Sequence, residues 1–484
     1  MSDIKRDIVA KRLARIAQEG FTLGHPVPER REVPLVAFDR PPFVICEVKR
    51  RSPSRGEIQG NLDAVAQARR YVEAGIKTIS VLTEEDYFSG SLQDLIDVKK
   101  AFPDVAVLRK DFLVSRDDLD VAFRAGADAV LLIAALLSAD ELADLKAWGE
   151  SLGMAVFVEV HDAADVAKAR PLKPRFTGIN CRNLGDFSLD RALPLKVRPL
   201  VDWTTRLVFE SGISRLEEAS WAGEAGFQGV LVGEGAVRNP GLARELATGF
   251  RPPSVHHPSD DVSFWSRLYS RLRPGRPLVK ICGLAHRQDA ELAQELGADL
   301  LGFILVPSPR RVDAGFLRSL RAIRGLKVGV VALGPHEPVP DEFVDLLDDG
   351  LLDALQFHGQ ETPALVDIWA SRGDKAVRAN SPAALEPFQK GIAPRILADA
   401  FVKDSEGRIL TGGTGQRIPN DVLAALGSQS LWLAGGLGPG NIAEVIRTWR
   451  PELIDASSGL EAVPGHKDPA KLKAYFQEIE NACL

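Results

Sequence analysis

The chain has 484 residues, of which 45% are hydrophobic and 26% are charged. These fractions are close to the averages of soluble globular proteins and exclude disordered and fibrous classes, while the length exceeds what one hydrophobic core organises, so we expect two large domains. The formal net charge of −6 gives no general field that would gather nucleic acid or an anionic membrane. We therefore expect neither as a partner, and any anionic ligand must be held locally.

The N-terminal segment MSDIKRDIVAKRLARIAQEG carries a charge every few residues and lacks the apolar stretch of a signal peptide, so it predicts an amphipathic helix. No run of ~18 apolar residues occurs, so we expect no membrane span. The four cysteines, Cys46, Cys181, Cys282 and Cys483, form neither a disulfide framework nor a paired C-x-x-C metal site. This usage indicates a reducing compartment and hence a cytoplasmic protein.

Short apolar runs alternate along the chain with charged segments of helical spacing, which is typical of a parallel α/β fold. In the first half we predict strands near 43–48, 77–82, 105–109, 128–133, 154–160, 176–180, 206–210 and 228–233. In the second half we predict strands near 277–282, 299–305, 326–332, 352–357, 375–379, 395–399, 430–435 and 452–456. A doubly wound sheet has the same rhythm, but eight strands in each half favour two (β/α)8 TIM barrels in tandem.

A local repeat and a proline-rich segment support this division. Gly75, Gly126, Gly226 and Gly297 each stand between a helical segment and an apolar run, where a left-handed helix C-cap is expected. Residues 251–277 hold five prolines around an amphipathic segment. We therefore expect one barrel over 1–252, a linker over 253–276 and a second barrel over 277–484, with the pair His256 and His257 as solvated linker residues rather than a metal site.

Polar residues gather where the predicted strands of the first half end, which is the catalytic face of such a barrel. They are Glu47 and Lys49 on strand one, Arg109, Lys110 and Asp111 on strand three, Glu159 on strand five, Asn180 and Arg182 on strand six, and Glu210 and Ser211 on strand seven. Lysines and carboxylates that share one mouth perturb each other's pKa values, as acid and base chemistry near neutral pH requires. The segments SGI at 211–213 and VGEG at 232–235 offer backbone N–H groups for a phosphate.

The motifs EVKRRSPSRG, LRKDF, FVEV, INCRNL, ESGI and LVGE, in this order from Glu47 to Glu234, resemble indole-3-glycerol-phosphate synthase, which closes the ring of carboxyphenylamino-deoxyribulose phosphate with loss of carbon dioxide and water. By position, the resemblance implies Lys110 as general acid on the substrate carbonyl, Glu159 as acid/base in the dehydration, and Lys49 as the residue that holds the substrate carboxylate and assists proton transfer. It further implies Glu47 and Asn180 as orienting residues, Glu210 as part of the polar site, Arg182 as a substrate contact, and Ser52, Ser211, Gly212 and Gly233 as phosphate ligands. Glu234 departs from the serine of many relatives, and we expect its carboxylate to point away from the phosphate.

In the second half, Cys282 ends the first predicted strand in KICGL and Asp399 ends the sixth in RILADAF. A thiol with a lowered pKa can act as a base, and a carboxyl group across the ring can give a proton to a bound sugar. Glycine-rich loops follow strands six, seven and eight, at 412–415, 434–441 and 455–459. Paired backbone amides on consecutive loops predict an anion cradle.

The motifs KICGL, GFILVPSPRRV, LQFHG, ILADA, GGTGQ, LAGGLGPGNI and DASSGLE resemble phosphoribosylanthranilate isomerase, which performs an Amadori rearrangement. The resemblance implies Cys282 as general base, Asp399 as general acid on the ring oxygen and Arg310 as partner of the anthranilate carboxylate. It implies Gly435, Gly436, Ser457 and Ser458 as phosphate ligands. Ala285 and His286, and a lengthened loop after Asp399, depart from the family pattern and concern loop closure rather than the acid and the base.

The isomerase product is the synthase substrate, so the two resemblances support each other and imply small phosphosugar–anthranilate substrates. No G-x-G-x-x-G motif stands in a strand-to-helix turn with an acidic residue ~20 positions on, so we expect no nicotinamide cofactor, and no metal. Joined barrels can cover each other's apolar patches, and we expect a monomer. Two alternatives remain: an aldolase barrel in which Lys110 forms a Schiff base, and a chain in which one barrel is catalytic and the other is a silent phosphosugar-binding module.

Overall fold

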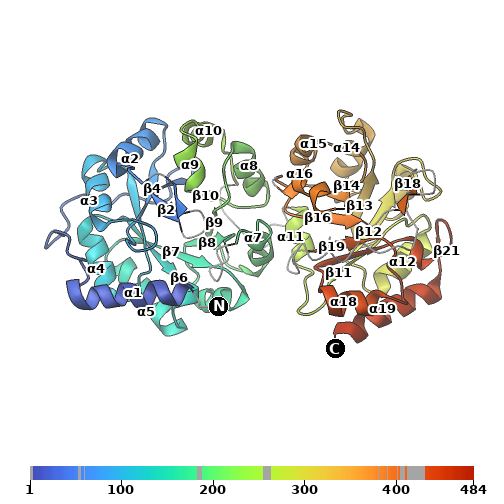
Figure 1. Cartoon of the computed structure of the whole chain (residues 1–484), viewed down its shortest axis with the longest axis horizontal. Coiled ribbons are helices and arrows are strands. Elements are labelled where there is room, and N and C mark those ends of the chain that lie inside the picture. Colours follow the sequence, from blue (N-terminus) through green and yellow to red (C-terminus); the bar gives the residue numbers. More distant parts are fainter. Residues whose placement is uncertain are drawn as a thin grey trace. The chain divides into compact units, whose positions relative to one another are not determined.

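The computed structural model of the chain describes residues 4–52, 56–58, 60–182, 188–253, 263–379, 381–389, 391–399, 402–403, 409–410 and 431–483. The chain forms two compact units, Met1–Val262 and Ser263–Leu484 (Figure 1). The division between them falls inside the segment expected as a linker. None of the helices among these residues is long and apolar enough to cross a membrane.

The first unit is a closed barrel of eight parallel strands in the order β1-β10-β9-β8-β7-β6-β5-β4. The strands are β1 (Val44–Val48), β4 (Thr78–Leu82), β5 (Ala106–Lys110), β6 (Ala129–Ile133), β7 (Ala155–Val160), β8 (Phe176–Asn180), β9 (Arg206–Glu210) and β10 (Gly229–Val232). A small hairpin, β2 (Arg51–Ser52) with β3 (Gly56–Glu57), follows β1. Every strand predicted in the first half is present, and the predicted barrel is confirmed.

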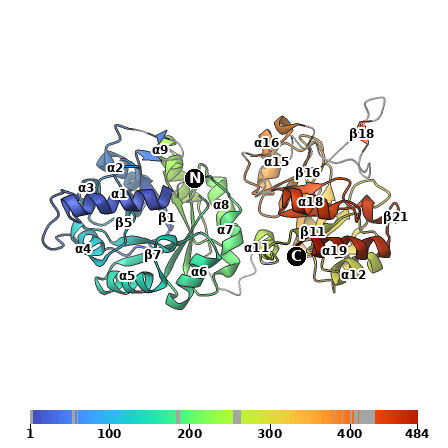
Figure 2. The same cartoon turned by 60° about the horizontal axis from the view of Figure 1, so that its bottom comes forward.

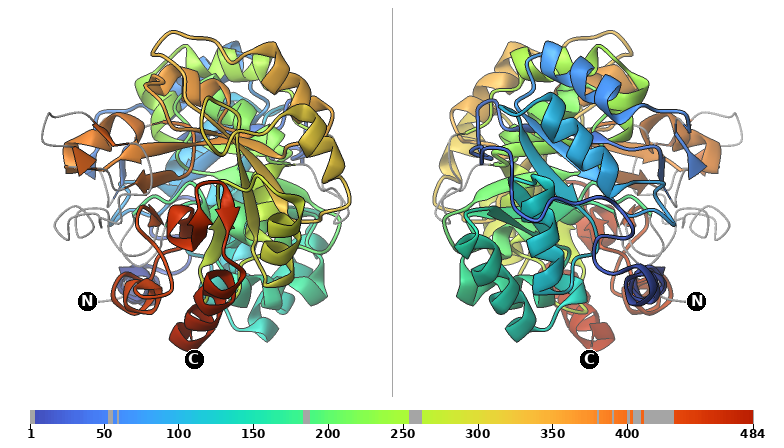
Figure 3. Two further views of the ribbon diagram at one scale, coloured as in Figure 1. Left: turned by 90° about the vertical axis from the view of Figure 1, so that its right-hand side faces the viewer. Right: turned by 90° about the vertical axis from the view of Figure 1, so that its left-hand side faces the viewer.

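Helices alternate with these strands and surround them, as the views toward each unit in Figure 3 show. They are α1 (Ile4–Glu19), α2 (Ala64–Glu73), α3 (Leu92–Ala101), α4 (Arg116–Ala125), α5 (Ala139–Ser151), α6 (Ala163–Ala169), α7 (Leu193–Val197), α8 (Leu216–Glu224), α9 (Glu234–Arg238) and α10 (Leu242–Gly249), with 3-10 turns at Ala134–Leu136, Arg170–Leu172 and Arg198–Leu200. Ser115 begins α4 with a capping box, and Gly126 ends it with a φ of 102° that suits glycine.

Inward-facing positions of the first barrel change from apolar to charged toward the carboxyl ends of the strands. Four aromatic rings, Phe38, Phe43, Phe157 and Phe176, pack together with centroids 5.2–6.1 Å apart in the apolar part. Because side chains alternate along a strand, the next inward position after each apolar residue belongs to the catalytic face. Four strands show this change: Ile45 precedes Glu47, Leu108 precedes Lys110, Phe157 precedes Glu159, and Val208 precedes Glu210.

The second unit is also a closed parallel barrel, in the order β11-β12-β13-β14-β15-β16-β19-β20. Its strands are β11 (Leu278–Ile281), β12 (Leu300–Ile304), β13 (Leu326–Val331), β14 (Ala354–Phe357), β15 (Gly373–Arg378), β16 (Ile396–Asp399), β19 (Trp432–Ala434) and β20 (Leu453–Ala456). Two hairpins accompany it, β17 (Val402–Lys403) with β18 (Ile409–Leu410), and β21 (Glu461–Val463) with β22 (His466–Lys467). The second predicted barrel is confirmed as well.

The helices of the second unit are α11 (Phe264–Tyr269), α12 (Arg287–Glu295), α13 (Ala314–Ser319), α14 (Asp341–Asp348), α15 (Pro363–Ile368), α16 (Glu386–Gln389), α18 (Ile442–Trp449) and α19 (Pro469–Cys483), with 3-10 turns at Pro382–Ala384 and Ser458–Leu460. The last two long helices, α18 and α19, pack side by side (Figure 2). Helix α11 lies within the expected linker, yet its buried Trp265 donates from Nε1 to Ala370 O at 2.7 Å and packs against Trp432. Residues 264–269 therefore belong to the core of the second unit.

Candidate active sites

A cavity of about 430 Å³ opens at the carboxyl ends of the strands of the first barrel. Its lining includes the predicted site residues Glu47, Lys49, Lys110, Glu159, Asn180, Arg182, Ser211, Gly212 and Gly233. Glu210 is not among the lining residues, but it accepts a hydrogen bond from Lys110, which lines the cavity. The backbone of Ser52 pairs in the β2–β3 hairpin, while its side chain lies outside the described part of the structure.

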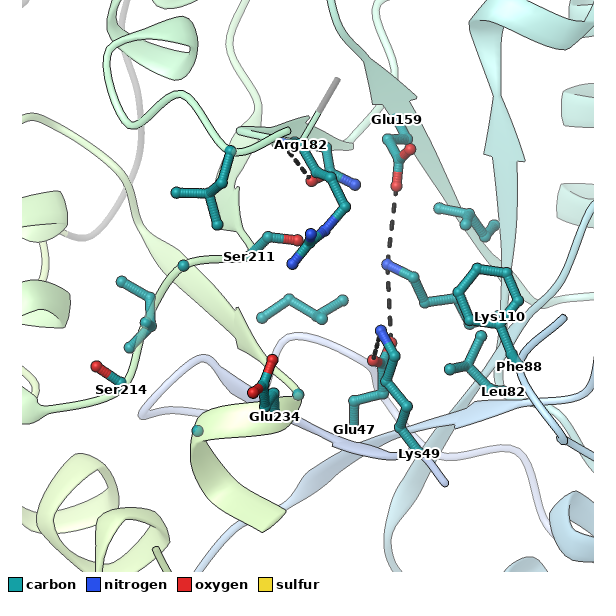
Figure 4. Close-up of a pocket in the computed structure, with 18 of the residues that line it drawn as sticks. Glu47, Lys49, Leu82, Phe88, Lys110, Glu159, Arg182, Ser211, Ser214 and Glu234 are labelled. Atoms are coloured by element: carbon teal, nitrogen blue, oxygen red, sulfur yellow. Dashed lines mark hydrogen bonds and ion pairs between the residues drawn. The ribbon is translucent and has the colours of Figure 1, made fainter. Parts of the chain in front are cut away.

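Lys110 is surrounded by three carboxylates that come from three other strands. Its Nζ donates to Glu210 Oε2 at 2.8 Å and lies 3.7 Å from Glu159 Oε2 and 3.9 Å from Glu47 Oε2. Figure 4 shows the ammonium group between Glu159 and Glu47. Burial opposes its charge, but the three carboxylates outweigh burial and raise the pKa of Lys110, so this side chain remains a cation at neutral pH.

The carboxylates have unequal proton affinities. Burial, followed by the negative charge of Glu159, raises the pKa of Glu210. Burial also opposes the charge on Glu159, but contacts with His161 and Lys110 outweigh it and lower the pKa of Glu159. The site therefore combines a carboxylate that stays ionised with a carboxyl group that takes up a proton more readily, an arrangement suited to acid and base chemistry.

Lys49 provides a second cation in the same cavity. Its Nζ lies 3.3 Å from Glu47 Oε1 and 5.4 Å from the centre of the Phe88 ring. Burial, and then the nearby cations Lys110 and Arg182, lower the pKa of Lys49 despite the attraction of Glu47. Lys49 therefore exchanges a proton closer to neutral pH than an ordinary lysine does.

Two glycines make room for the carboxylates. A Cβ added at Gly178, on β8, would lie 2.0 Å from Glu210 Oε1, and one added at Gly233 would lie 2.7 Å from Glu47 Oε1. Real Cβ atoms essentially never come within 3.0 Å of such neighbours. Glu210 and Glu47 can therefore occupy these places only because residues 178 and 233 are glycines.

The loop after β9 turns sharply beside the cavity. Ser211 and Gly212 both have left-handed backbones, with φ of 71° and 74°. Asn180 Oδ1 accepts a hydrogen bond from the backbone N–H of Arg182 at 3.1 Å, which orders the end of β8 next to this loop. Arg191, which the sequence analysis missed, lines the cavity and donates from Nη2 to Gly212 O at 3.2 Å and to Glu218 Oε1 at 2.6 Å.

Two strand-end expectations need correction. Glu234 does not point away: it lines the cavity, where Figure 4 shows its carboxylate, and its Oε1 lies 2.8 Å from Nε of Arg238, another lining residue.

Arg109 lies outside the cavity lining. It is fully buried and donates to Thr83 Oγ1 at 3.2 Å and to Asp111 Oδ2 at 3.1 Å. Because neighbouring strand residues point in opposite directions, Lys110 faces the cavity while Arg109 does not.

In the second barrel, Cys282 directly follows β11 and Asp399 ends β16. Cys282 is buried, and a Cβ added at Gly302 would lie 2.8 Å from its Sγ, so glycine leaves room for the sulfur. Asp399 Oδ2 lies 3.0 Å from Nε2 of His358, which follows β14 in the motif LQFHG. His358 had no predicted role, because the sequence around a histidine that follows a strand does not indicate which residue it contacts.

The pKa of the Cys282 thiol is raised, not lowered as expected from the sequence. Burial raises the pKa of Cys282, and the nearby ammonium groups of Lys280 and Lys467 only partly counter it. Lys280 lies on the inward face of β11 and donates to Asp455 Oδ2 at 2.6 Å and to Gln356 Oε1 at 2.7 Å. Cys282 is therefore a neutral thiol at neutral pH.

Arg310 is held by the β21–β22 hairpin. Its Nε and Nη2 donate to the two oxygens of Glu461 at 2.8 and 2.7 Å, and Lys467 Nζ donates to Glu461 Oε1 at 3.1 Å. Gly283 lies against the same side chain, since an added Cβ there would lie 2.7 Å from Arg310 Cδ. The guanidinium predicted to bind a carboxylate thus already makes a two-bond contact with one.

The glycine-rich loops after β19 and β20 meet closely. Gly435 and Gly436 have φ of 93° and 60°, and Asn441 Nδ2 donates to Gly436 O at 2.8 Å. A Cβ added at Gly459 would lie 2.2 Å from Leu437 O, so the loop that carries Ser457 and Ser458 packs directly on the preceding glycine loop. The third predicted loop, 412–415, lies outside the described residues.

No group of three or more histidine, cysteine, aspartate or glutamate residues is placed to hold a metal ion in the part of the chain that the structure describes. A buried polar layer crosses the second barrel instead, in which Gln356 Nε2 donates to Asp374 Oδ2 at 2.9 Å beside the Lys280–Asp455 pair. Burial raises the pKa of Asp374 to about 6.

Comparison with known proteins assigns each barrel a family. Residues 6–248 match indole-3-glycerol phosphate synthase, and residues 279–478 match N-(5'-phosphoribosyl)anthranilate (PRA) isomerase. The tryptophan biosynthesis protein TrpCF of Yersinia pestis is 31% identical over 90% of this chain and 84% of its own length. A multifunctional tryptophan biosynthesis protein of Schizosaccharomyces pombe is 32% identical over 91% of this chain, which spans 59% of that protein.

Among solved structures, phosphoribosylanthranilate isomerase from Thermotoga maritima is 29% identical, with 42% of this chain and 99% of that chain covered and a TM-score of 0.37.

Proposed function

Because the chain belongs to the family of tryptophan-biosynthesis proteins that carry an indole-3-glycerol phosphate synthase and a phosphoribosylanthranilate isomerase, we propose that it catalyses two consecutive reactions. The C-terminal barrel isomerises N-(5-phosphoribosyl)anthranilate to 1-(2-carboxyphenylamino)-1-deoxyribulose 5-phosphate. The N-terminal barrel converts that product to indole-3-glycerol phosphate with loss of carbon dioxide and water. The observation that supports this proposal most strongly is the placement of Lys110 within 3.9 Å of three carboxylates.

In the proposed synthase reaction, Lys110 contacts the substrate carbonyl and stabilises the negative charge that ring closure creates on its oxygen. A cation that is already in place needs no reorganisation at the moment of reaction, which is the usual source of such stabilisation. Lys49 binds the substrate carboxylate that leaves as carbon dioxide, and its lowered pKa lets it assist proton transfer. Glu159 acts as acid and base in the dehydration.

The other synthase residues bind or orient the substrate in this proposal. Glu47 holds Lys49, and Glu210 holds Lys110, at the distances given above. Asn180 and Arg182 contact the substrate from the end of β8. The phosphate lies at Ser52, Ser211, Gly212 and Gly233, where the left-handed loop after β9 and the backbone after β10 face the cavity.

In the proposed isomerase reaction, Asp399 gives a proton to the ribose ring oxygen and Cys282 takes one from C2 of the resulting imine. His358 orients the Asp399 carboxyl group through its 3.0 Å contact. Because burial raises the pKa of Cys282, the thiol must lose its proton in the substrate complex before it can act as a base. The positive charges of Lys280 and Lys467 stabilise the thiolate that forms. The substrate carboxylate contacts Arg310 through Nη1, because Nε and Nη2 bind Glu461. Gly435, Gly436, Ser457 and Ser458 take the phosphate.

The domain assignment in this proposal is a synthase barrel over 1–252, a connecting segment over 253–276, whose helix α11 packs on the second barrel, and an isomerase barrel over 277–484. We further propose a cytoplasmic monomer that needs neither metal nor cofactor, which gel filtration and assays in the presence of a chelator test. Separate expression of the two compact units, 1–262 and 263–484, tests both assignments together. We expect each to fold and to catalyse one reaction, and a folded C-terminal unit that fails to isomerise its substrate would contradict the assignment.

A further inference from the structure

Glu159 is one end of a row of three titratable side chains that leads out of the synthase cavity. His161 Nε2 lies 3.1 Å from Glu159 Oε1, and His161 Nδ1 lies 3.4 Å from Asp165 Oδ2. The row follows from local structure, because residues 159 and 161 share one face of the chain at the end of β7. Asp165 lies in the first turn of α6 and also accepts a hydrogen bond from the backbone N–H of His161 at 3.1 Å.

The two contacts of the imidazole depend on its charge. Both ring nitrogens lie within ion-pair distance of a carboxylate, yet neither is aligned for a hydrogen bond with it. The attraction is therefore largely electrostatic and requires a protonated ring. Burial opposes that charge, but the two carboxylates outweigh it and raise the pKa of His161 to about 9. Both ring nitrogens are buried while 11% of the side-chain surface is exposed, so a proton from solvent reaches the nitrogens when the ring moves.

The charged groups around this row divide into two sides. Beyond Glu159 lie Lys110, with Nζ 3.7 Å from Glu159 Oε2, and Glu210, which binds Lys110. Beyond Asp165 lies Lys168, with Nζ 3.8 Å from Asp165 Oδ1. Lys110 and His161 together hold Glu159 as a carboxylate, which can accept a proton but has none of its own to give.

This state of Glu159 leaves a gap in the dehydration step, in which a hydroxyl group must leave as water. The departing oxygen needs a proton, and the raised pKa of Lys110 makes its ammonium group a poor donor. Two groups beside Glu159 carry a proton at neutral pH: the carboxyl group of Glu210, whose pKa burial raises to about 8, and the imidazolium of His161. Glu210 is fully buried inside the barrel, whereas His161 lies in the row that leads out of the cavity.

We propose that His161 is a positioning residue that supplies the proton of the dehydration step through Glu159. The inference rests on the proposed synthase function. When the ring turns so that Nε2–H points at Glu159, the N–H bond breaks as an O–H bond forms on Glu159. This O–H bond then breaks as the C–O bond of the substrate breaks and water leaves with that bond's electron pair. The proton released from carbon when the indole ring forms balances the one consumed, and solvent reprotonates His161. No oxidant, reductant or co-reactant is needed.

The test is the pH dependence of synthase turnover in the full-length chain, with His161→Gln compared with wild type. We expect wild-type turnover to hold through neutral pH and to fall as the pH rises past about 9, where His161 loses its proton. In His161→Gln we expect at least a ~10-fold lower kcat at pH 7.5, since positioned proton transfer typically contributes 10²–10⁴-fold. The residual activity should rise toward acidic pH, because Glu159 without the imidazolium takes up its own proton more readily. KM should change by less than about 3-fold.

Two further variants separate this role from structural damage. Asp165→Asn keeps the imidazole and removes one carboxylate, so the alkaline fall in kcat should move to lower pH. His25→Asn removes another histidine–glutamate pair of the same barrel, His25 Nε2 with Glu85 Oε1 at 2.8 Å, which lies outside the cavity lining, and it should leave the profile unchanged.

If His161→Gln folds and has the kcat and pH profile of wild type, the proposal is wrong. If His161→Gln does not fold, an Asp165→Asn chain whose kcat falls at the same alkaline pH as wild type would overturn it. A wild-type chain that forms no indole-3-glycerol phosphate at any pH would refute the proposed function itself and this inference with it.

Discussion

Gly178→Ala is a sharp test of the synthase site, because it changes no group proposed to touch the substrate. The added Cβ would lie 2.0 Å from Glu210 Oε1 and 2.7 Å from Phe157 Cζ, whereas ordinary contact begins at 3.4 Å. Glu210 must therefore shift by about 1.4 Å, the difference between 3.4 and 2.0 Å, or the strands must separate. Either change displaces the carboxyl group whose Oε2 accepts the 2.8 Å hydrogen bond from Lys110.

The expected effect on catalysis is large and the effect on stability moderate. A misplacement of about 1 Å costs up to ~100-fold in rate, so we expect synthase kcat to fall 10- to 100-fold. Overpacking of this kind costs about 1–3 kcal/mol of unfolding free energy. Steady-state synthase assays and thermal unfolding measure both, while isomerase turnover should stay within 2-fold. Gly223→Ala on α8 is the matched control, because its Cβ makes only an ordinary contact, at 3.4 Å, with Phe250. Full synthase activity in a folded Gly178→Ala chain would show that the position of Glu210 beside Lys110 does not matter for catalysis.

Five other substitutions test further residues of the two barrels. Lys110→Ala or Glu159→Gln should lower synthase turnover at least ~100-fold with isomerase turnover within a few-fold, and near-normal synthase turnover would contradict the assignment. Cys282→Ala and Asp399→Asn should each lower isomerase turnover at least ~100-fold with KM changed far less, whereas more than half the turnover in Cys282→Ala would show that the thiol only packs. Burial raises the pKa of Asp374 from 3.8 to about 6, so the folded barrel holds a proton that the unfolded chain releases between these values. The unfolding free energy then falls as pH rises from 4 to 6, by up to about 3 kcal/mol from this group, and Asp374→Asn should lack that part of the fall in denaturant titrations.

The sequence predicted both barrels because the evidence for them is local. Each strand is a short apolar run, and Gly75, Gly126, Gly226 and Gly297 all have the left-handed backbone expected after a helix. Alternation along a strand is also local, which is why Glu47 and Lys49 were expected on one side and line one cavity. Residues whose role follows from the strand period and the fold can thus be placed from sequence.

Contacts between distant segments decided what the sequence could not predict. Which of Arg109 and Lys110 faces the cavity depends on the side of β5 that turns inward in the barrel. Arg109 also shares its partner Asp111 with Arg12, 97 residues away on α1, which donates to Asp111 at 3.1 Å. The Glu234 carboxylate forms an ion pair with Arg238, one helical turn further along α9. The serine found at this position in many relatives does not indicate that ion pair. The raised pKa of Cys282 reflects burial, which motif reading cannot measure.

Conversion of N-(5-phosphoribosyl)anthranilate by the purified full-length chain is the most direct test of the two proposed activities. The substrate is supplied with a chelator and without added cofactor, and the products are followed by chromatography. We expect indole-3-glycerol phosphate to accumulate with one carbon dioxide released per molecule. Cys282→Ala should stop the conversion before the first step, and Lys110→Ala should stop it before the second. Unchanged substrate, or a wild-type reaction that stops at 1-(2-carboxyphenylamino)-1-deoxyribulose 5-phosphate, would contradict this expectation.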